Sequence, residues 1–210
     1  MAEFMTYVWC VEKLHSIWSR CTPGLFNTNL KKLGIRHIYH DCDRDFELRR
    51  RVRGAQSNIK MISTSAQKTY RFGYGENLVE AMSRGCEVKV LLATTHSDYV
   101  NDLHDLQRYP PNGLPVGEHI LNDEIIGFEA YFKNNSTSAT EGRMTIGHYR
   151  THFRANMTII DDRFGFYMPT LPPTSSKKTL CLELIEGPVL NDCRNHFDAI
   201  VRAGTPWVVI

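Results

Sequence analysis

The chain has 210 residues, enough for one large domain with a substantial buried core. An apolar content of 42% and a formal net charge of +2 exclude collagen-like and disordered chains and do not require a polyanionic partner. No apolar run is long enough to cross a membrane, and the first residues lack the basic and apolar regions of a signal peptide, so we expect a cytoplasmic protein.

Residues 4–20 carry apolar side chains at helical spacing, which predicts a helix that packs on the domain or on a partner. We therefore divide the chain into an N-terminal helical segment, 1–34, and a domain over 35–210. A short strand is predicted over 35–39, and Asp43 is placed to cap the helix that follows it.

A strand–helix–strand unit is predicted over residues 59–93. Its strands cover 59–62 and 87–93, and its helix runs from about Gly75 to Arg84, with Gly85 suited to the position just after the helix. This order implies two parallel strands joined by a right-handed crossover.

The rest of the chain is predicted to hold helices and then strands. The helices cover 98–109 and 118–133, the β-rich segments cover 144–153, 156–160, 164–168 and 180–185, and a last helix begins near Pro188. These elements predict an α/β domain with a mixed sheet.

The chain has six cysteines, and no two of them form a C-x-x-C pair. This spacing favours reduced thiols over a disulfide scaffold or a metal ribbon. Residues 37–43 gather histidine, aspartate and cysteine, but the same residues fit a strand-to-helix junction, and we expect no metal site. A Walker box, a dinucleotide fingerprint and a serine-hydrolase elbow are all absent from the sequence, so we expect no cofactor.

Two features leave alternatives open. The basic run 49–53 fits a solvated helix face or a patch that faces phosphates. The hydroxyl residues 63–65 follow a predicted central strand, where ligands of parallel sheets bind, so Ser63 and Ser65 fit a phosphate or cap the following turn.

The strongest candidate site is a row of polar residues, Arg150, His152, Arg154 and Asn156. Alternation along one strand would place all four on the same face. Guanidinium groups match phosphate oxygens, and histidine exchanges a proton near neutral pH, so the row predicts an anion site. The alternative is a sheet face that meets water.

The order of elements and several local segments resemble the phospholipase D superfamily in its single-domain bacterial form. The segments are residues 55–65, 85–97, 157–161, 182–188 and 196–207. The resemblance implies a mixed sheet with helices on both faces, in α-β-α layers. It also implies a phosphodiesterase or nuclease as the possible enzyme class, and a homodimer, since one motif per chain normally requires pairing.

The family's signature is His-x-Lys-x4-Asp, in which the histidine attacks phosphorus and the lysine holds phosphate oxygens. With Asp161 as the motif's aspartate, Arg154 takes the histidine position and Asn156 the lysine position. With His152 and Arg154 as histidine and lysine, Asp161 comes two residues too late. An arginine stays protonated and is a poor nucleophile, so Arg154 would bind a phosphate rather than attack it.

Three functions remain as hypotheses. The first is a domain with a degenerate motif that binds a nucleotide, a nucleic acid or a lipid headgroup, with turnover lost or altered. The second is an active, metal-independent phosphodiesterase that works through His152 as a homodimer, and the third is a non-catalytic sensor or interaction module. The candidate catalytic residues are His152, Arg154, Asn156, Asp161 and Glu183, and the candidate ligand-binding residues are Arg150, Ser63, Ser65 and Lys68.

Overall fold

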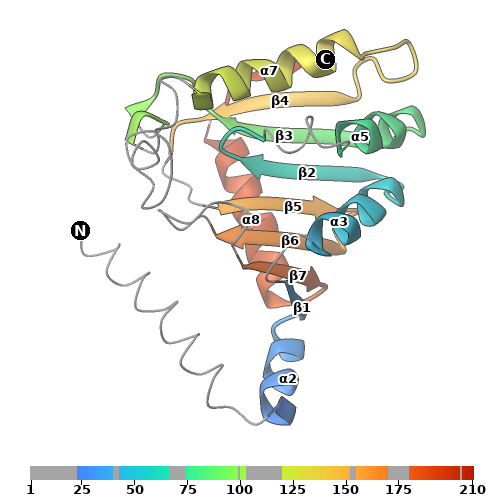
Figure 1. Ribbon diagram of the computed structural model, residues 1–210, viewed down its shortest axis with the longest axis vertical. Coiled ribbons are helices and arrows are strands. Elements are labelled where there is room, and N and C mark those ends of the chain that lie inside the picture. The colour runs from blue at the N-terminus through green and yellow to red at the C-terminus, as the bar shows by residue number, and fades with distance from the viewer. Residues whose placement is uncertain are drawn as a thin grey trace.

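The computed structural model describes residues 23–39, 43–66, 74–98, 100–102, 120–151, 155–169, 180–203 and 205–210. One eight-stranded mixed sheet forms the centre of the molecule, in the order β1-β7-β6-β5-β2-β3-β4-β8 (Figure 1). The strands are β1 (Ile35–Tyr39), β2 (Asn58–Ser63), β3 (Glu87–Ala93), β4 (Met144–Tyr149), β5 (Ala155–Ile160), β6 (Phe164–Pro169), β7 (Cys181–Ile185) and β8 (Trp207–Val209). The helices are α2 (Pro23–Lys32), α3 (Asp43–Arg53), α5 (Tyr74–Ser83), α7 (Ile120–Asn134) and α8 (Pro188–Arg202).

The middle of the sheet is parallel. Strands β2, β3 and β4 run in the same direction, and the remaining neighbours pair antiparallel. The predicted parallel pair of β2 and β3 is therefore confirmed, and so is the position of Gly85 after α5, where φ is +97°. Four consecutive residues at the end of β3, 90–93, are fully buried, as expected for a central parallel strand covered on both faces.

Helices cover both faces of the sheet. On one face α7 contacts β4 through Glu129 and His148, and α3 contacts β7 through Arg51 and Glu183. On the other face α8 packs so closely that a Cβ on Gly165 of β6 would lie 2.7 Å from Leu190. Figure 1 shows α8 behind the sheet and α3 in front of it, so the predicted layers are confirmed.

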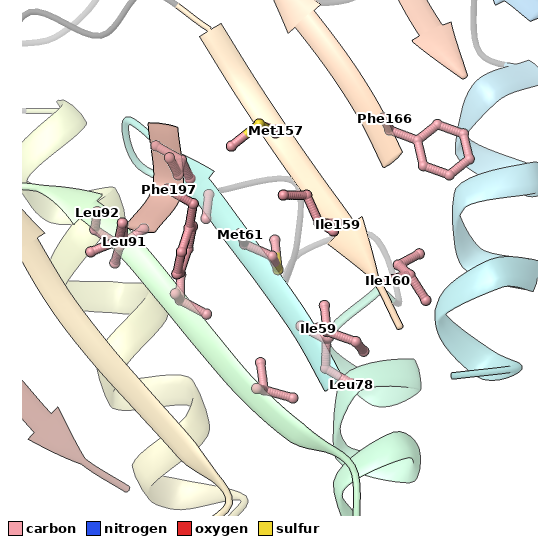
Figure 2. Close-up of a cluster of buried hydrophobic side chains, with 14 of the residues drawn as sticks. Ile59, Met61, Leu78, Leu91, Leu92, Met157, Ile159, Ile160, Phe166 and Phe197 are labelled. Carbon is pink, nitrogen blue, oxygen red and sulfur yellow. The ribbon is translucent and has the colours of Figure 1, made fainter. Parts of the chain in front are cut away.

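The hydrophobic core lies between the sheet and the helices on its two faces. Figure 2 shows apolar side chains of β2, β3 and β5 packed side by side, with Phe197 of α8 beside Leu91 and Leu78 of α5 near Ile59. All four of these side chains are at most 1% exposed. Burying a side chain of this size stabilises the fold by roughly 1.5–3 kcal/mol. The three described cysteines, at 86, 181 and 193, are free thiols within this core.

The structure corrects the prediction for the strand over 144–153 and adds α2 and β8, and most of the helix expected over 98–109 lies outside the described residues. The strand expected over 144–153 ends at Tyr149. Helix α2 and the short strand β8 were not expected, although α2 contacts β1 and β8 extends the sheet beside β4. The helix expected over 4–20 lies outside the described residues.

Candidate functional site

The carboxyl ends of β2, β3 and β4 meet the amino end of β5 at one edge of the sheet, which we name the carboxyl edge. Ile62 pairs with Met157 in the antiparallel register of β2 and β5. The next residues outward, Ser63 and Asn156, are therefore neighbours, and they share a face because paired side chains of an antiparallel ladder point the same way. Ligands of open α/β sheets bind at this kind of edge.

Ser63 fixes the side chain of Asn156. The Ser63 hydroxyl donates to Asn156 Oδ1 at 2.6 Å and accepts the backbone N–H of Ala66 at 3.0 Å. The second bond closes a turn in which Ala66 has a φ of +51°. Because the amide oxygen of Asn156 is used, its NH2 group is left with two donors that have no hydrogen-bond partner among the described residues.

A carboxylate lies close to this pair. Ser65 donates its hydroxyl proton to Glu124 Oε2 at 2.5 Å, and the Glu124 side chain comes from α7 and is only 7% exposed. This distance is typical of a hydroxyl bonded to an ionised oxygen. Glu124 lies among the apolar residues Leu121, Ile125 and Phe128 of the helix, and a charge within an apolar stripe is the sequence signal that points to it.

The turn after β3 also contacts α7. Asn122, which is 4% exposed, accepts the backbone N–H of His96 at 2.9 Å, and its amide nitrogen lies 3.4 Å from His96 Nδ1. His96 has a φ of +56°, so the asparagine holds a backbone conformation that few residues adopt without support.

One further pair lies on the same face and was not predicted. His148 Nε2 lies 2.8 Å from Glu129 Oε1, and both side chains are about one-fifth exposed. His148 is level with Leu92, and Leu92 is level with Ser63. The fully buried Leu92 therefore separates the His148–Glu129 pair from Ser63.

The predicted row of Arg150, His152, Arg154 and Asn156 does not lie on one strand. Arg150 follows β4 and is exposed, whereas Asn156 belongs to β5, and β2 and β3 lie between these two strands. The chain leaves one strand and enters another that is three places away, so the alternation rule does not extend across residues 150–156. His152, Arg154 and Lys68 lie outside the described residues.

Asp161 lies at the opposite end of β5 from Asn156. Its carboxylate accepts the backbone N–H groups of Gln56, Ser57 and Asn58 at 2.8–3.2 Å and the Ser57 hydroxyl at 2.9 Å. Partial burial raises the pKa of this carboxyl, but the hydrogen bonds from residues 56–58 outweigh it, and the pKa is lowered overall. These hydrogen bonds join the start of β2 to the turn after β5.

Glu183 is the most buried predicted catalytic residue, at 3% exposed. It accepts from Tyr39 at 2.9 Å, from Arg51 at 3.1 Å and from Arg36 at 3.4 Å, which ties β7 to β1 and α3. The described residues therefore bring Ser63, Ser65 and Asn156 together, and place Asp161 and Glu183 in other contacts.

A hollow of about 540 Å³ opens between β2 and α8. Lys60 Nζ lies 2.9 Å from Asp162 Oδ1, and Arg194 donates to the Asp162 carbonyl oxygen at 3.0 Å. The remaining lining residues are Asn191, Asn195 and Asp198. Two cations face two carboxylates here, so the hollow has no net preference for an anion.

Within the described ranges, no group of three or more histidine, cysteine, aspartate or glutamate side chains is arranged to hold a metal ion. In the same part of the chain, no helix combines the length and apolar character that a membrane span requires.

No protein-family model and no curated protein matches the chain. Several solved structures are similar to it. TrmBL2, an archaeal chromatin protein, is similar with a TM-score of 0.51 and 11% identity over 96% of this chain and 63% of its own. Phosphatidylserine synthase from Haemophilus influenzae Rd KW20 is similar with a TM-score of 0.52 and 12% identity over 81% of this chain and 39% of its own.

Nuc from Salmonella typhimurium, a phospholipase D family member, has a TM-score of 0.43 and 10% identity over 78% of this chain and 90% of its own. The phosphatidylserine synthase is a member of the same family. The likeness to the synthase, with its TM-score of 0.52, gives the eight-stranded mixed sheet with helices on both faces a phospholipase D-like α/β fold. The chain spans less than two thirds of TrmBL2 and of the synthase, and at 10–12% identity the likeness concerns the fold.

Proposed function

We propose that this phospholipase D-like domain binds a phosphate-bearing ligand at the carboxyl edge, with turnover lost or altered. The ligand class is a nucleotide, a nucleic acid or a lipid headgroup. The observation that carries the proposal is the Ser63–Asn156 pair near the start of β5, in which the amide NH2 has no hydrogen-bond partner among the described residues. Asn156 is also the residue that takes the place of the lysine when Asp161 is aligned with the aspartate of the family's motif.

The chemistry of Asn156 supports binding over catalysis. Its amide donates hydrogen bonds to phosphate oxygens, but it carries no charge with which to stabilise a transition state. Glu124 is a buried carboxylate bonded to Ser65 and repels an anion placed near it. The phosphate is therefore expected on the β5 side of Ser63, where Arg154 precedes the first residue of the strand.

Cations for the site come from residues 150–154 in this proposal. These residues join the end of β4 to the start of β5, and both ends lie at the carboxyl edge with β2 and β3 between them. Arg150 is exposed just after β4 and is expected to reach a ligand held by Asn156, and His152 and Arg154 are assigned to the same site from the sequence alone.

A thermal-shift experiment tests the proposal, with phosphate, tungstate and common nucleotides added to the wild type, to Asn156→Asp and to His152→Ala with Arg154→Ala. A ligand at a hundredfold excess over its Kd adds about 2.7 kcal/mol to the unfolding free energy. We expect stabilisation of the wild type and not of the two site variants, because Asn156→Asp puts a negative charge at the site and the double variant removes a cation and the imidazole. Lys133→Gln, on the exposed end of α7, is the matched control and is expected to respond as the wild type does.

An unchanged midpoint with every ligand, or equal stabilisation of all variants, contradicts the proposal. A second arm measures hydrolysis of a chromogenic phosphodiester in EDTA. Cleavage that His152→Ala abolishes would replace the binding domain with an active, metal-independent phosphodiesterase.

A further inference from the structure

Helix α3 presents one aromatic ring and three arginines on its outer side. Phe46, Arg49, Arg50 and Arg53 follow the spacing i, i+3, i+4, i+7, so they form one stripe, which we name the α3 outer face. Phe46 is 75% exposed, the largest exposure of any large apolar side chain in the described residues. The side chains of Arg50 and Arg53 are 57% and 69% exposed.

The inner side of α3 anchors the helix firmly. Val52 is completely buried, and the Arg51 guanidinium lies 4.1 Å above the centre of the Phe164 ring while it also bonds to Glu183. The basic run noted in the sequence therefore divides into one structural arginine, Arg51, and an exposed set. The exposed set sits on a helix whose position is fixed by the core, as Figure 1 shows for α3 in front of the sheet.

Two of the exposed arginines, Arg49 and Arg53, are available to an outside anion. Arg53 lies 3.2 Å from Glu80 of α5, and both side chains are exposed, so this pair contributes little and a phosphate can replace the carboxylate at small cost. Arg50 is held through two hydrogen bonds by Glu47 of the same helix, whose side chain is only 17% exposed, and keeps this partner. Among the described residues, no carboxylate lies within 4 Å of Arg49.

We propose that the α3 outer face binds single-stranded nucleic acid. A single strand alternates phosphates with unstacked bases, and the stripe alternates guanidinium groups with an exposed ring. Arg49 and Arg53 are one helical turn apart, about 6 Å along the axis, and both reach the same strand. Phe46 gives a base a ring to stack on, whereas in a duplex the bases are already stacked.

An anionic membrane fits the surface less well. Helices that lie in a membrane interface bury a wide apolar face, and Phe46 is the one exposed large apolar residue among the described residues of α3. The other large apolar residues described there, Leu48 and Val52, pack against the core.

The α3 outer face is separate from the carboxyl edge. Arg53 ends α3 five residues before β2 begins, so it lies near the amino end of β2, whereas Ser63 lies at the other end of that strand. The inference therefore goes beyond the proposed phosphate site, and either can fail without the other.

The test is fluorescence anisotropy of a labelled 20-nucleotide oligothymidylate, measured from 50 to 200 mM salt. Wild type is compared with Phe46→Ala, with Phe46→Trp and with Arg49→Gln, Arg50→Gln, Arg53→Gln combined. The matched control is Lys31→Gln, Lys32→Gln, Arg202→Gln, which removes three exposed charges elsewhere. Circular dichroism melts establish that each variant is folded.

The triple arginine variant is expected to bind at least tenfold more weakly and to lower the slope of log K against log salt by about 2, since each phosphate contact contributes about 0.7. Phe46→Ala is expected to weaken binding about fivefold or more, with Phe46→Trp restoring it. The matched control is expected to bind as the wild type does.

Four results would overturn the inference. The first is that the wild type does not bind the oligonucleotide at 50 mM salt, and the second is that the matched control loses as much affinity as the triple arginine variant. The third is that the wild type binds a duplex more tightly than the single strand and Phe46→Ala has no effect, and the fourth is that the wild type is retained more strongly on phosphatidylserine vesicles than on the oligonucleotide. The last result would assign the surface to a membrane.

Discussion

Asp161 shows how a residue from a suspected catalytic motif serves the fold. Its carboxylate gathers three backbone N–H groups and a hydroxyl at the start of β2. Asp161→Asn keeps the left-handed backbone, which asparagine tolerates, but loses the charge-assisted bonds. We expect a loss of about 1–2 kcal/mol in unfolding free energy by urea denaturation. Asp123→Asn, exposed on α7, is the control and should change nothing.

The same variant should alter the acid limb of the stability curve. The pKa of Asp161 is lowered in the folded state, so its contribution is complete above the unfolded value of about 3.9 and is lost as the pH falls through the lower folded value. In urea melts from pH 6 to pH 2.5, the difference between the wild type and Asp161→Asn should therefore shrink towards the acid end. A difference that stays constant over this range would show that the charge is not responsible.

Glu183 carries a second prediction at the residue scale. Glu183→Gln removes the charge that faces Arg51 and Arg36, and leaves the partly buried Arg51 with Glu47 as its carboxylate partner. We expect a loss of about 1–3 kcal/mol from the lost charge-assisted hydrogen bonds, with anion binding by the folded protein unchanged. Glu186→Gln, exposed three residues later, is the control. If Glu183→Gln left the unfolding free energy unchanged but abolished anion binding, Glu183 would be a functional residue rather than a structural one.

At the scale of elements, the backbone at Gly34 lies very close to the backbone at the end of β7. Gly34, before β1, has a φ of +80°, and a Cβ there would lie 2.8 Å from the Ile185 carbonyl oxygen. Gly85 has a φ of +97° with nothing within 4 Å of such a Cβ. Alanine costs about 1–2 kcal/mol at either position for the left-handed backbone. At Gly34 it should cost about 1–3 kcal/mol more for the clash.

Chemical denaturation of Gly34→Ala and Gly85→Ala measures this difference directly, because the two variants share the backbone term. Equal losses would mean that the loop beside β1 moves aside without cost.

Elements with strong local patterns were predictable from the sequence. The run 87–93 is apolar enough to be a buried strand, and Pro188 marks the first turn of α8. The sequence predicts β4 and β5 as two separate segments, but it does not predict that β2 and β3 lie between them in the sheet. Alternation reports which face a residue occupies within a strand, and it carries no information on where the strand lies in the sheet.

At the scale of the whole molecule, the candidate site was predictable only in part. Ser63, Ser65 and Asn156 were expected to be functional and do lie at one edge. Glu124, the partner of Ser65, and Glu129, the partner of His148 of β4, both come from α7, and only the packing of this helix on the sheet brings them there. Contacts of this kind depend on tertiary structure and leave a weak local signal.

The most direct test of the account is a tungstate soak of crystals of the intact chain, read from the anomalous difference map. The account predicts a peak within hydrogen-bonding distance of Asn156 Nδ2, on the β5 side of Ser63, and no such peak in Asn156→Asp. A peak confined to other surfaces, or one at the carboxyl edge that persists in Asn156→Asp, would contradict an anion site built on this asparagine.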